Sequence, residues 1–211
     1  MERVFLHGLG QTPGSWAPVL GLLPGGGAAR TPSLMKMMEE EGASYPALRR
    51  AFARYCDGLK GPINLCGLSL GAVLALDYAA ARPGRVCSLV LIGGRDAMPS
   101  SLLKGQDLIF RLMPRRAFGG MGLTKGQTRA LAASMARMDL SGRPGAVRCP
   151  ALVVCGARDW ANRGAAFRLA RGIPGAKLRL IPGAGHEVNR EAPDALARAL
   201  RHFYGGLTAR G

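Results

Sequence analysis

The sequence predicts an α/β fold in which helices cover both faces of a mostly parallel sheet, a doubly wound arrangement. Short apolar runs alternate with stretches long enough for helices along most of the chain. The runs are apolar with little interruption, as expected for strands that are buried on both faces. Of the 211 residues, 48% are apolar and 20% are charged, a balance typical of globular chains. We therefore expect a single domain over 1–211.

The elements are predicted in the order strand, helix, strand along the chain. The five strands are expected over 4–6, 63–66, 89–92, 151–155 and 178–181. The helices are expected over 15–23, with Ser15 as the cap, and over 45–59, 70–81, 163–171 and 193–204. The stretch 70–81 is apolar nearly all round, and Pro193 suits the first turn of a helix because its missing N–H has no partner there. Alternation of this kind produces a parallel sheet with right-handed crossovers.

The segment 95–148 interrupts the alternation. It contains no convincing strand, only the helical pieces 101–113 and 124–138 between glycines and prolines. An insert at this place lies over the strand ends, where ligands bind in open α/β sheets, so we predict a small helical lid over 95–148. Its ten basic and three acidic residues fit either an anionic substrate or a solvated surface. Its apolar residues fit either an acyl or aryl pocket or packing within the lid: Leu102, Leu103, Leu108, Ile109, Phe110, Met113, Phe118 and Met121.

The pentapeptide Gly67-Leu68-Ser69-Leu70-Gly71 stands where the second predicted strand gives way to the apolar helix. A nucleophile elbow needs a sharp turn at this junction, which lifts a serine hydroxyl out of the sheet. Small residues two positions before and after the serine let backbone segments approach closely. Ser69 is therefore the candidate nucleophile, and the alternative is a glycine-flanked turn serine without a catalytic role.

A serine hydroxyl needs a base to accept its proton and an acid to orient that base. Among three histidines, His186 is the candidate base because it lies in a glycine-rich loop directly after the last predicted strand. Asp159 is the candidate acid because it follows the preceding strand, which gives the chain order serine, acid, histidine. Asp96, after the third strand, is the alternative acid.

Backbone N–H groups must also stabilise the oxygen that gains charge when a carbonyl is attacked. The loop His7-Gly8-Leu9-Gly10 follows the first predicted strand and precedes a helix, so its backbone can turn toward the other strand ends. The N–H groups of Leu9 and Leu70 are the expected oxyanion hole. We expect His7 to shape this loop rather than to transfer protons.

With these motifs the chain resembles the α/β-hydrolase family, and it is especially similar to short bacterial serine hydrolases with an HGLGQTP loop and a GLSLG elbow. The resemblance covers almost the whole chain. It implies Ser69 as nucleophile, Asp159 as acid and His186 as base. It also implies that the family's usual first hairpin is missing here, which leaves a sheet of about six strands.

The residues and the resemblance together imply hydrolysis of a carboxylic ester or a related acyl substrate through an acyl-enzyme, without a metal or another cofactor. The resemblance also implies that a serine nucleophile in place of an aspartate argues against dehalogenase and epoxide-hydrolase chemistry. Three alternatives stay open because one fold supports several reactions. They are a thioesterase, a carbon–carbon lyase acting on an anionic substrate, and a ligand receptor without turnover.

Composition bears on partners and location. The net charge is +16, yet the basic residues are spread along the chain and form no nucleic-acid-binding motif. We therefore expect a small-molecule acyl substrate and no nucleic acid as partner. No apolar stretch is long enough to span a bilayer, and the N-terminus lacks the pattern of a signal peptide. Five cysteines without a CxxC pair favour free thiols, so the expected location is the cytoplasm.

Overall fold

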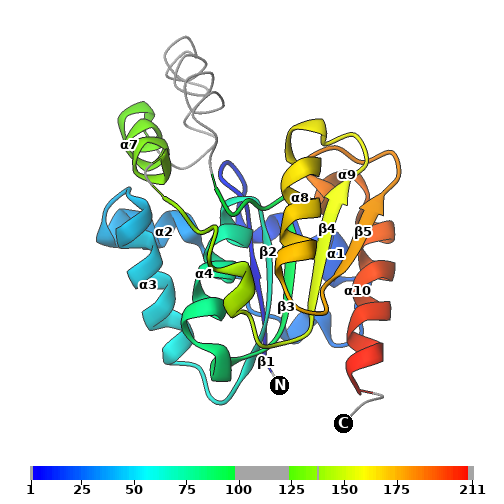
Figure 1. Cartoon of the computed structure of the whole chain (residues 1–211). Helices are drawn as coiled ribbons and strands as arrows, with labels where there is room; N and C mark the ends of the chain where they lie inside the picture. The colour runs from blue at the N-terminus through cyan, green and yellow to red at the C-terminus, as the bar shows by residue number, and fades with distance from the viewer. Residues whose placement is uncertain (1, 98–123, 137, 209–211) are drawn as a thin grey trace.

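The computed structural model describes residues 2–97, 124–136 and 138–208. Within them, the strands form one central sheet (Figure 1). Five parallel strands lie side by side in chain order: β1 (Glu2–Leu6), β2 (Ile63–Leu68), β3 (Val86–Ile92), β4 (Ala151–Gly156) and β5 (Lys177–Ile181). Each predicted strand lies within one of them. The prediction of a parallel α/β sheet is confirmed.

The described sheet has five strands where about six were expected. Beside β1, Arg30 forms a one-residue parallel bridge. Its N–H donates to Arg3 O, and its carbonyl accepts from Phe5 N, each at 2.8 Å. A bidentate ion pair between Arg30 and Glu2 supports the bridge. A single residue therefore takes the position next to β1 where a further strand would pair.

Helices connect the strands and cover the sheet. The α-helices are α1 (Ala17–Leu20), α2 (Leu34–Glu41), α3 (Tyr45–Asp57), α4 (Leu70–Ala81), α7 (Lys125–Ala136), α8 (Trp160–Gly172), α9 (Val188–Glu191) and α10 (Pro193–Thr208). Short 3₁₀ turns lie at η1 (Pro13–Trp16), η2 (Gly26–Ala28), η3 (Pro83–Arg85) and η4 (Pro144–Ala146). Helix α4 has the predicted bounds, and its first ten residues are all buried, as its all-round apolar character predicts.

Alternate side chains of the strands point to opposite faces and build two apolar cores. Leu65 and Val153 belong to a core that includes buried residues of α2, α3, α4 and α8. Their chain neighbours Cys66 and Leu152 belong to a second core with Trp16 and the apolar side of α10. In Figure 1, α3 and α4 lie toward the left of the view and α10 lies toward its right. The two cores place α3 and α4 on one face of the sheet and α10 on the other. Helices therefore cover both faces, which confirms the doubly wound arrangement.

Two local predictions need correction. Ser15 does not cap a helix over 15–23, because it lies inside η1 and its hydroxyl accepts a hydrogen bond from Thr12 N at 3.2 Å. The helix that follows ends at Leu20. The strand β5 is not uniformly buried, because it is the edge of the sheet and exposes Lys177 and Arg179.

The insert 95–148 is described in part. Helix α7 confirms the predicted helical piece 124–138, whereas 101–113 and the eight apolar residues considered for a pocket lie outside the described residues. Ala97 and Asp139 form an antiparallel bridge where the insert leaves and rejoins the sheet. Tyr45 N donates to Ser134 Oγ at 2.8 Å and thereby ties α7 to α3. The single domain over 1–211 and the lid over 95–148 remain predictions.

Within the described ranges, no helix combines the length and the apolar character needed to cross a membrane. All five cysteines are free thiols, as expected, and four of them are buried.

Candidate active site

The carboxyl ends of the strands are joined to one another by hydrogen bonds that continue beyond the strand ladders. Ser69 N donates to Ile92 O at 2.8 Å, Gly93 N to Val154 O at 3.0 Å, and Ala157 N to Ile181 O at 2.9 Å. The predicted site residues all follow these strand ends: Leu9 after β1, Ser69 and Leu70 after β2, Asp159 after β4, and His186 after β5. The parallel topology therefore gathers them at one edge of the sheet.

Ser69 has a backbone conformation that residues with a side chain rarely adopt, with φ 54° and ψ −114°. Among the described residues it is the one non-glycine residue with positive φ. Such a conformation costs on the order of 1–3 kcal/mol and persists only where the surroundings fix it. Here a Cβ at Gly67 would collide with Gly71 O, and a Cβ at Gly71 would lie 2.6 Å from Leu6 Cβ. Gly67 is needed because β2 and α4 meet closely around the serine, and Gly71 is needed because α4 begins against the end of β1.

Asp159 and His186 are in direct contact. His186 Nδ1 lies 2.8 Å from Asp159 Oδ2, and Asp159 is buried whereas 41% of the His186 side chain is exposed. Burial acts to raise the pKa of Asp159, but hydrogen bonds from His186 and Asn162 outweigh it, so this pKa lies below its ordinary value. An ionised carboxylate beside Nδ1 favours a proton on that nitrogen and leaves Nε2 free to accept one.

Gly93 connects this pair to Ser69. A Cβ at Gly93 would lie 3.1 Å from His186 Nδ1 and 3.5 Å from Asp159 Oδ2, so the imidazole packs on the backbone just after β3. The preceding residue, Ile92, accepts the Ser69 N–H. One end of β3 therefore contacts Ser69 and His186 through adjacent residues.

Asp96, the alternative acid, has a different partner. Its Oδ1 lies 3.3 Å from Arg168 Nη2 of α8. Of the two candidate carboxylates, the structure brings Asp159 to His186.

The loop after β1 passes close to Ser69. A Cβ at Gly8 would lie 3.3 Å from Ser69 Cβ. Leu9 follows directly, and Leu70 is the first residue of α4, where backbone N–H groups have no acceptor within the helix. The two residues predicted for the oxyanion hole thus lie in the two segments that adjoin the serine.

His7 is fully buried at the start of this loop. Its Nε2 accepts from Leu34 N at 3.1 Å, so Nδ1 carries the proton and donates to Gly8 O at 2.9 Å. Burial lowers the pKa of His7, which keeps the ring neutral around pH 7. The ring ties the loop to α2, in keeping with a shaping role.

Two polar contacts around the site were not predicted from the sequence. Asn162 Nδ2 donates to both oxygens of Asp159 at 2.8 Å, and Arg95 Nε donates to Asn162 Oδ1 at 2.6 Å. The spacing of three between Asp159 and Asn162, at a helix start, is a signal that was overlooked. Arg95 carries no such signal because it lies 67 positions away in the chain.

A buried amide pair joins the loops before and after the site. Gln11 and Asn189 exchange two hydrogen bonds of 3.1 Å each, and both side chains are almost fully buried. Asn189 also donates to Ser15 O. The pair links the loop that contains Leu9 to the segment after His186, a contact between residues 178 positions apart.

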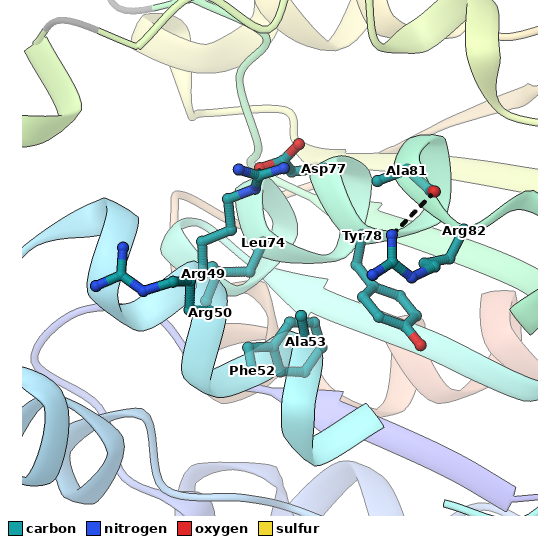
Figure 2. A pocket seen from close by; sticks show the side chains of 9 residues that line it. All are labelled: Arg49, Arg50, Phe52, Ala53, Leu74, Asp77, Tyr78, Ala81 and Arg82. Carbon is teal, nitrogen blue, oxygen red and sulfur yellow. Dashed lines mark hydrogen bonds and ion pairs between the residues drawn. The ribbon is translucent and has the colours of Figure 1, made fainter. Parts of the chain in front are cut away.

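A groove of about 180 Å³ lies away from these residues, between α3 and α4 (Figure 2). Arg49 Nε lies 2.6 Å from Asp77 Oδ2, Arg143 Nε lies 3.1 Å from Oδ1, and Tyr45 donates to the same carboxylate. In Figure 2, Arg49 reaches to Asp77 while Arg50 extends away from it. Of the adjacent pair Arg49-Arg50, Arg49 therefore holds a buried carboxylate. In the part of the chain that is described, no three His, Cys, Asp or Glu side chains are grouped to hold a metal ion.

Known proteins with similar sequences include an esterase and another hydrolase. The pimeloyl-[acyl-carrier protein] methyl ester esterase of Aromatoleum aromaticum is 37% identical over 96 residues, which cover 44% of this chain and 36% of that protein. The 2-hydroxy-6-oxononadienedioate/2-hydroxy-6-oxononatrienedioate hydrolase 1 of Dechloromonas aromatica is 28% identical over 177 residues, 67% of this chain and 61% of that protein. The matched regions thus span only about a third and about three fifths of these relatives.

Solved structures share the fold over nearly the whole chain. A thermophilic esterase from Thermogutta terrifontis superposes with a TM-score of 0.78 at 23% identity, covering 98% of this chain and 90% of that one. An enol-lactonase from Burkholderia xenovorans gives a TM-score of 0.77 at 19% identity, covering 97% and 91%. The model of a family described as "Alpha/beta hydrolase family" matches residues 4–199. The chain therefore belongs to the alpha/beta hydrolase family.

Proposed function

We propose that the chain is a serine hydrolase that cleaves a carboxylic ester or a related acyl substrate through an acyl-enzyme intermediate. The observation that carries the proposal is the 2.8 Å contact between Asp159 and His186, at the same sheet edge as the constrained turn at Ser69. Family membership supports hydrolytic chemistry, and the Aromatoleum relative is named as an esterase.

In the first half of the proposed reaction, Ser69 Oγ attacks the substrate carbonyl carbon while His186 Nε2 accepts the hydroxyl proton. Nδ1 faces Asp159, so Nε2 is the nitrogen available for this transfer. The carbonyl oxygen gains negative charge, which the N–H groups of Leu9 and Leu70 stabilise. His186 then gives its proton to the leaving alcohol as the carbon–oxygen bond breaks, and the acyl group stays on Ser69.

In the second half, His186 takes a proton from water, and the resulting hydroxide attacks the acyl-enzyme. The tetrahedral intermediate uses the same two N–H donors. Collapse of this intermediate releases the carboxylic acid and returns the proton from His186 to Ser69. Asp159 stays ionised and stabilises the imidazolium in both halves.

A thioester or a carbon–carbon bond next to a carbonyl is the second candidate for the bond that is cleaved. The substrate in the name of the Dechloromonas relative is a dicarboxylate, and the insert 95–148 holds ten basic residues against three acidic ones. Both observations favour an anionic substrate for this candidate. A receptor without turnover is the third reading of the same residues.

Free thiols agree with the expected cytoplasmic location.

The test is a substrate panel with the purified chain. It comprises para-nitrophenyl esters of increasing acyl length, acyl-coenzyme A thioesters, and a fluorophosphonate probe that labels activated serines. The proposal expects ester turnover that EDTA leaves unchanged. Turnover of thioesters alone would move the assignment to a thioesterase, and complete labelling without turnover of any substrate would favour the receptor.

A further inference from the structure

Asn162 has a contact that a helix start does not ordinarily provide. An aspartate that precedes a helix usually accepts a hydrogen bond from a backbone N–H of the first turn. At α8 the backbone N–H of Asn162 helps to lower the pKa of Asp159, and the side-chain amide of the same residue contributes more. Asn162 Nδ2 donates to both carboxylate oxygens at 2.8 Å. It also lies 3.0 Å from His186 Nδ1, which is no hydrogen bond when that nitrogen carries the proton, because both groups are then donors. The side-chain amide therefore adds to the backbone donor and holds the carboxylate with Oδ2 directed at His186.

Arg95 determines which end of the Asn162 amide faces Asp159. A guanidinium has only donors, so the amide group in contact with Arg95 Nε must be the oxygen. Arg95 Nε donates to Asn162 Oδ1 at 2.6 Å, and its Nη2 donates to Ala161 O. The NH₂ group must then point to Asp159. Partial burial lowers the pKa of Arg95, the charge of Asp159 acts in the opposite direction, and the guanidinium remains a cation.

We propose that Asn162, held by Arg95, is a positioning residue that keeps Asp159 Oδ2 directed at His186 Nδ1. The proposal rests on the proposed hydrolase function, since Nε2 is the proton acceptor only when Nδ1 carries the proton. Without the amide, the carboxylate can rotate about its Cβ–Cγ bond, and both imidazole tautomers become populated.

The first experiment replaces Asn162 with leucine, which has a similar size and no donor. We expect kcat for a para-nitrophenyl ester to fall about 10- to 100-fold with KM nearly unchanged, which is less than the roughly 10⁴-fold cost of the wrong tautomer in a comparable triad. Asn162→Ala also removes the donor and is expected to lose at least as much. It serves if Asn162→Leu does not fold.

The second readout is spectroscopic and needs no substrate. The ¹⁵N shifts of the imidazole nitrogens distinguish the tautomers, and with only three histidines His186 can be assigned from a His186→Gln spectrum. We expect a proton on Nδ1 in the wild type and a tautomer mixture in Asn162→Leu. The control is Asn64→Leu, a buried asparagine of β2 bonded to Ser88, which is expected to lower stability without altering the His186 tautomer.

The third experiment tests whether Arg95 acts through Asn162. Arg95→Met is expected to lower kcat several-fold, and the double variant Arg95→Met/Asn162→Leu is expected to match Asn162→Leu alone, since coupled residues are not additive. Arg168→Met removes an arginine of α8 that pairs with Asp96 and is the charge-matched control. Additive losses in the double variant would overturn the role of Arg95.

A wild-type tautomer in both Asn162→Leu and Asn162→Ala would overturn the proposal, whatever their activity. A wild type that hydrolyses no ester would refute the proposed function instead. The spectra would then still decide whether Asn162 positions Asp159.

Discussion

Asp159 and Asp96 both follow strand ends at the same edge of the sheet, yet their carboxylates have different partners. Asp159→Asn is expected to lower kcat about 10⁴-fold, because an amide favours the imidazole tautomer with its proton on Nε2. Asp96→Asn is expected to leave kcat nearly unchanged, because its partner is Arg168. Steady-state kinetics of the two variants provide the comparison. A severe loss in Asp96→Asn beside a near-normal Asp159→Asn would show that the acid comes from the end of β3.

His7 gives the fold a pH dependence that is separate from catalysis. Burial lowers its folded-state pKa below the ordinary value of 6.5, so the unfolded chain binds a proton at a higher pH than the folded chain does. Stability therefore rises with pH. The contribution is complete above about pH 6.5 and is lost as the pH falls from there through the folded-state pKa.

The prediction is that the free energy of unfolding of the wild type falls more steeply between about pH 7 and pH 5 than that of His7→Gln, by up to about 1.4 kcal/mol per pH unit. Glutamine retains a donor and an acceptor but does not titrate in this range. Urea titrations at a series of pH values measure the two slopes. Equal slopes would contradict a buried neutral His7.

At the scale of elements, the amide pair Gln11–Asn189 holds the loop after β1 and helix α9 together. Truncation of one member leaves a buried amide without its partner, which costs about 1–3 kcal/mol of folding free energy. Asn189→Leu and Gln11→Leu are each expected to lose this amount, and the double variant less than their sum, because it removes both polar groups. Denaturant unfolding measures the three values. Strict additivity would mean that the loop and the helix are not coupled through this pair.

The long elements follow from the sequence because their signals are local. The apolar runs mark all five strands, and the all-round apolar stretch before Arg82-Pro83-Gly84 gives the bounds of α4. Helices α2 and α9 have eight and four residues, too short for a repeated apolar pattern to identify them. The misplaced cap at Ser15 has a similar cause: the same hydroxyl can bond a backbone N–H before it or after it, and here it bonds Thr12.

At the scale of the whole molecule, the chain has a net charge of +16. If the substrate is anionic, this charge raises its local concentration, and salt screens the effect. We expect kcat/KM for the monomethyl ester of a dicarboxylic acid to fall several-fold between about 0.05 and 0.5 M salt. The neutral methyl ester of a monocarboxylic acid with equal length is the control. The same salt response for both esters would show that the net charge does not favour an anionic substrate.

The sequence also predicts which strand ends carry the candidate site, because a parallel sheet places the carboxyl ends of all its strands at one edge. A position after a strand end makes Ser69 and His186 candidates, but for the acid it leaves both Asp159 and Asp96 open, and only the contact with His186 distinguishes the two. The contacts of Asn162, Arg95, Gln11 and Asn189 depend on side-chain directions across 3 to 178 positions of the chain. Asn162 has a local signal, its spacing of three from Asp159 at a helix start, whereas Arg95, Gln11 and Asn189 emerge only from the structure.

The central claim is that Ser69 is the nucleophile, and its most direct test joins covalent labelling to turnover. We predict that a fluorophosphonate adds one group to the wild type, that peptide mapping places it on Ser69, and that Ser69→Ala lowers kcat for ester hydrolysis on the order of 10⁴- to 10⁶-fold. The variant is expected to retain the fold, as circular dichroism and thermal unfolding would show. A folded, pure Ser69→Ala protein that hydrolyses esters within about tenfold of the wild-type rate would contradict the account.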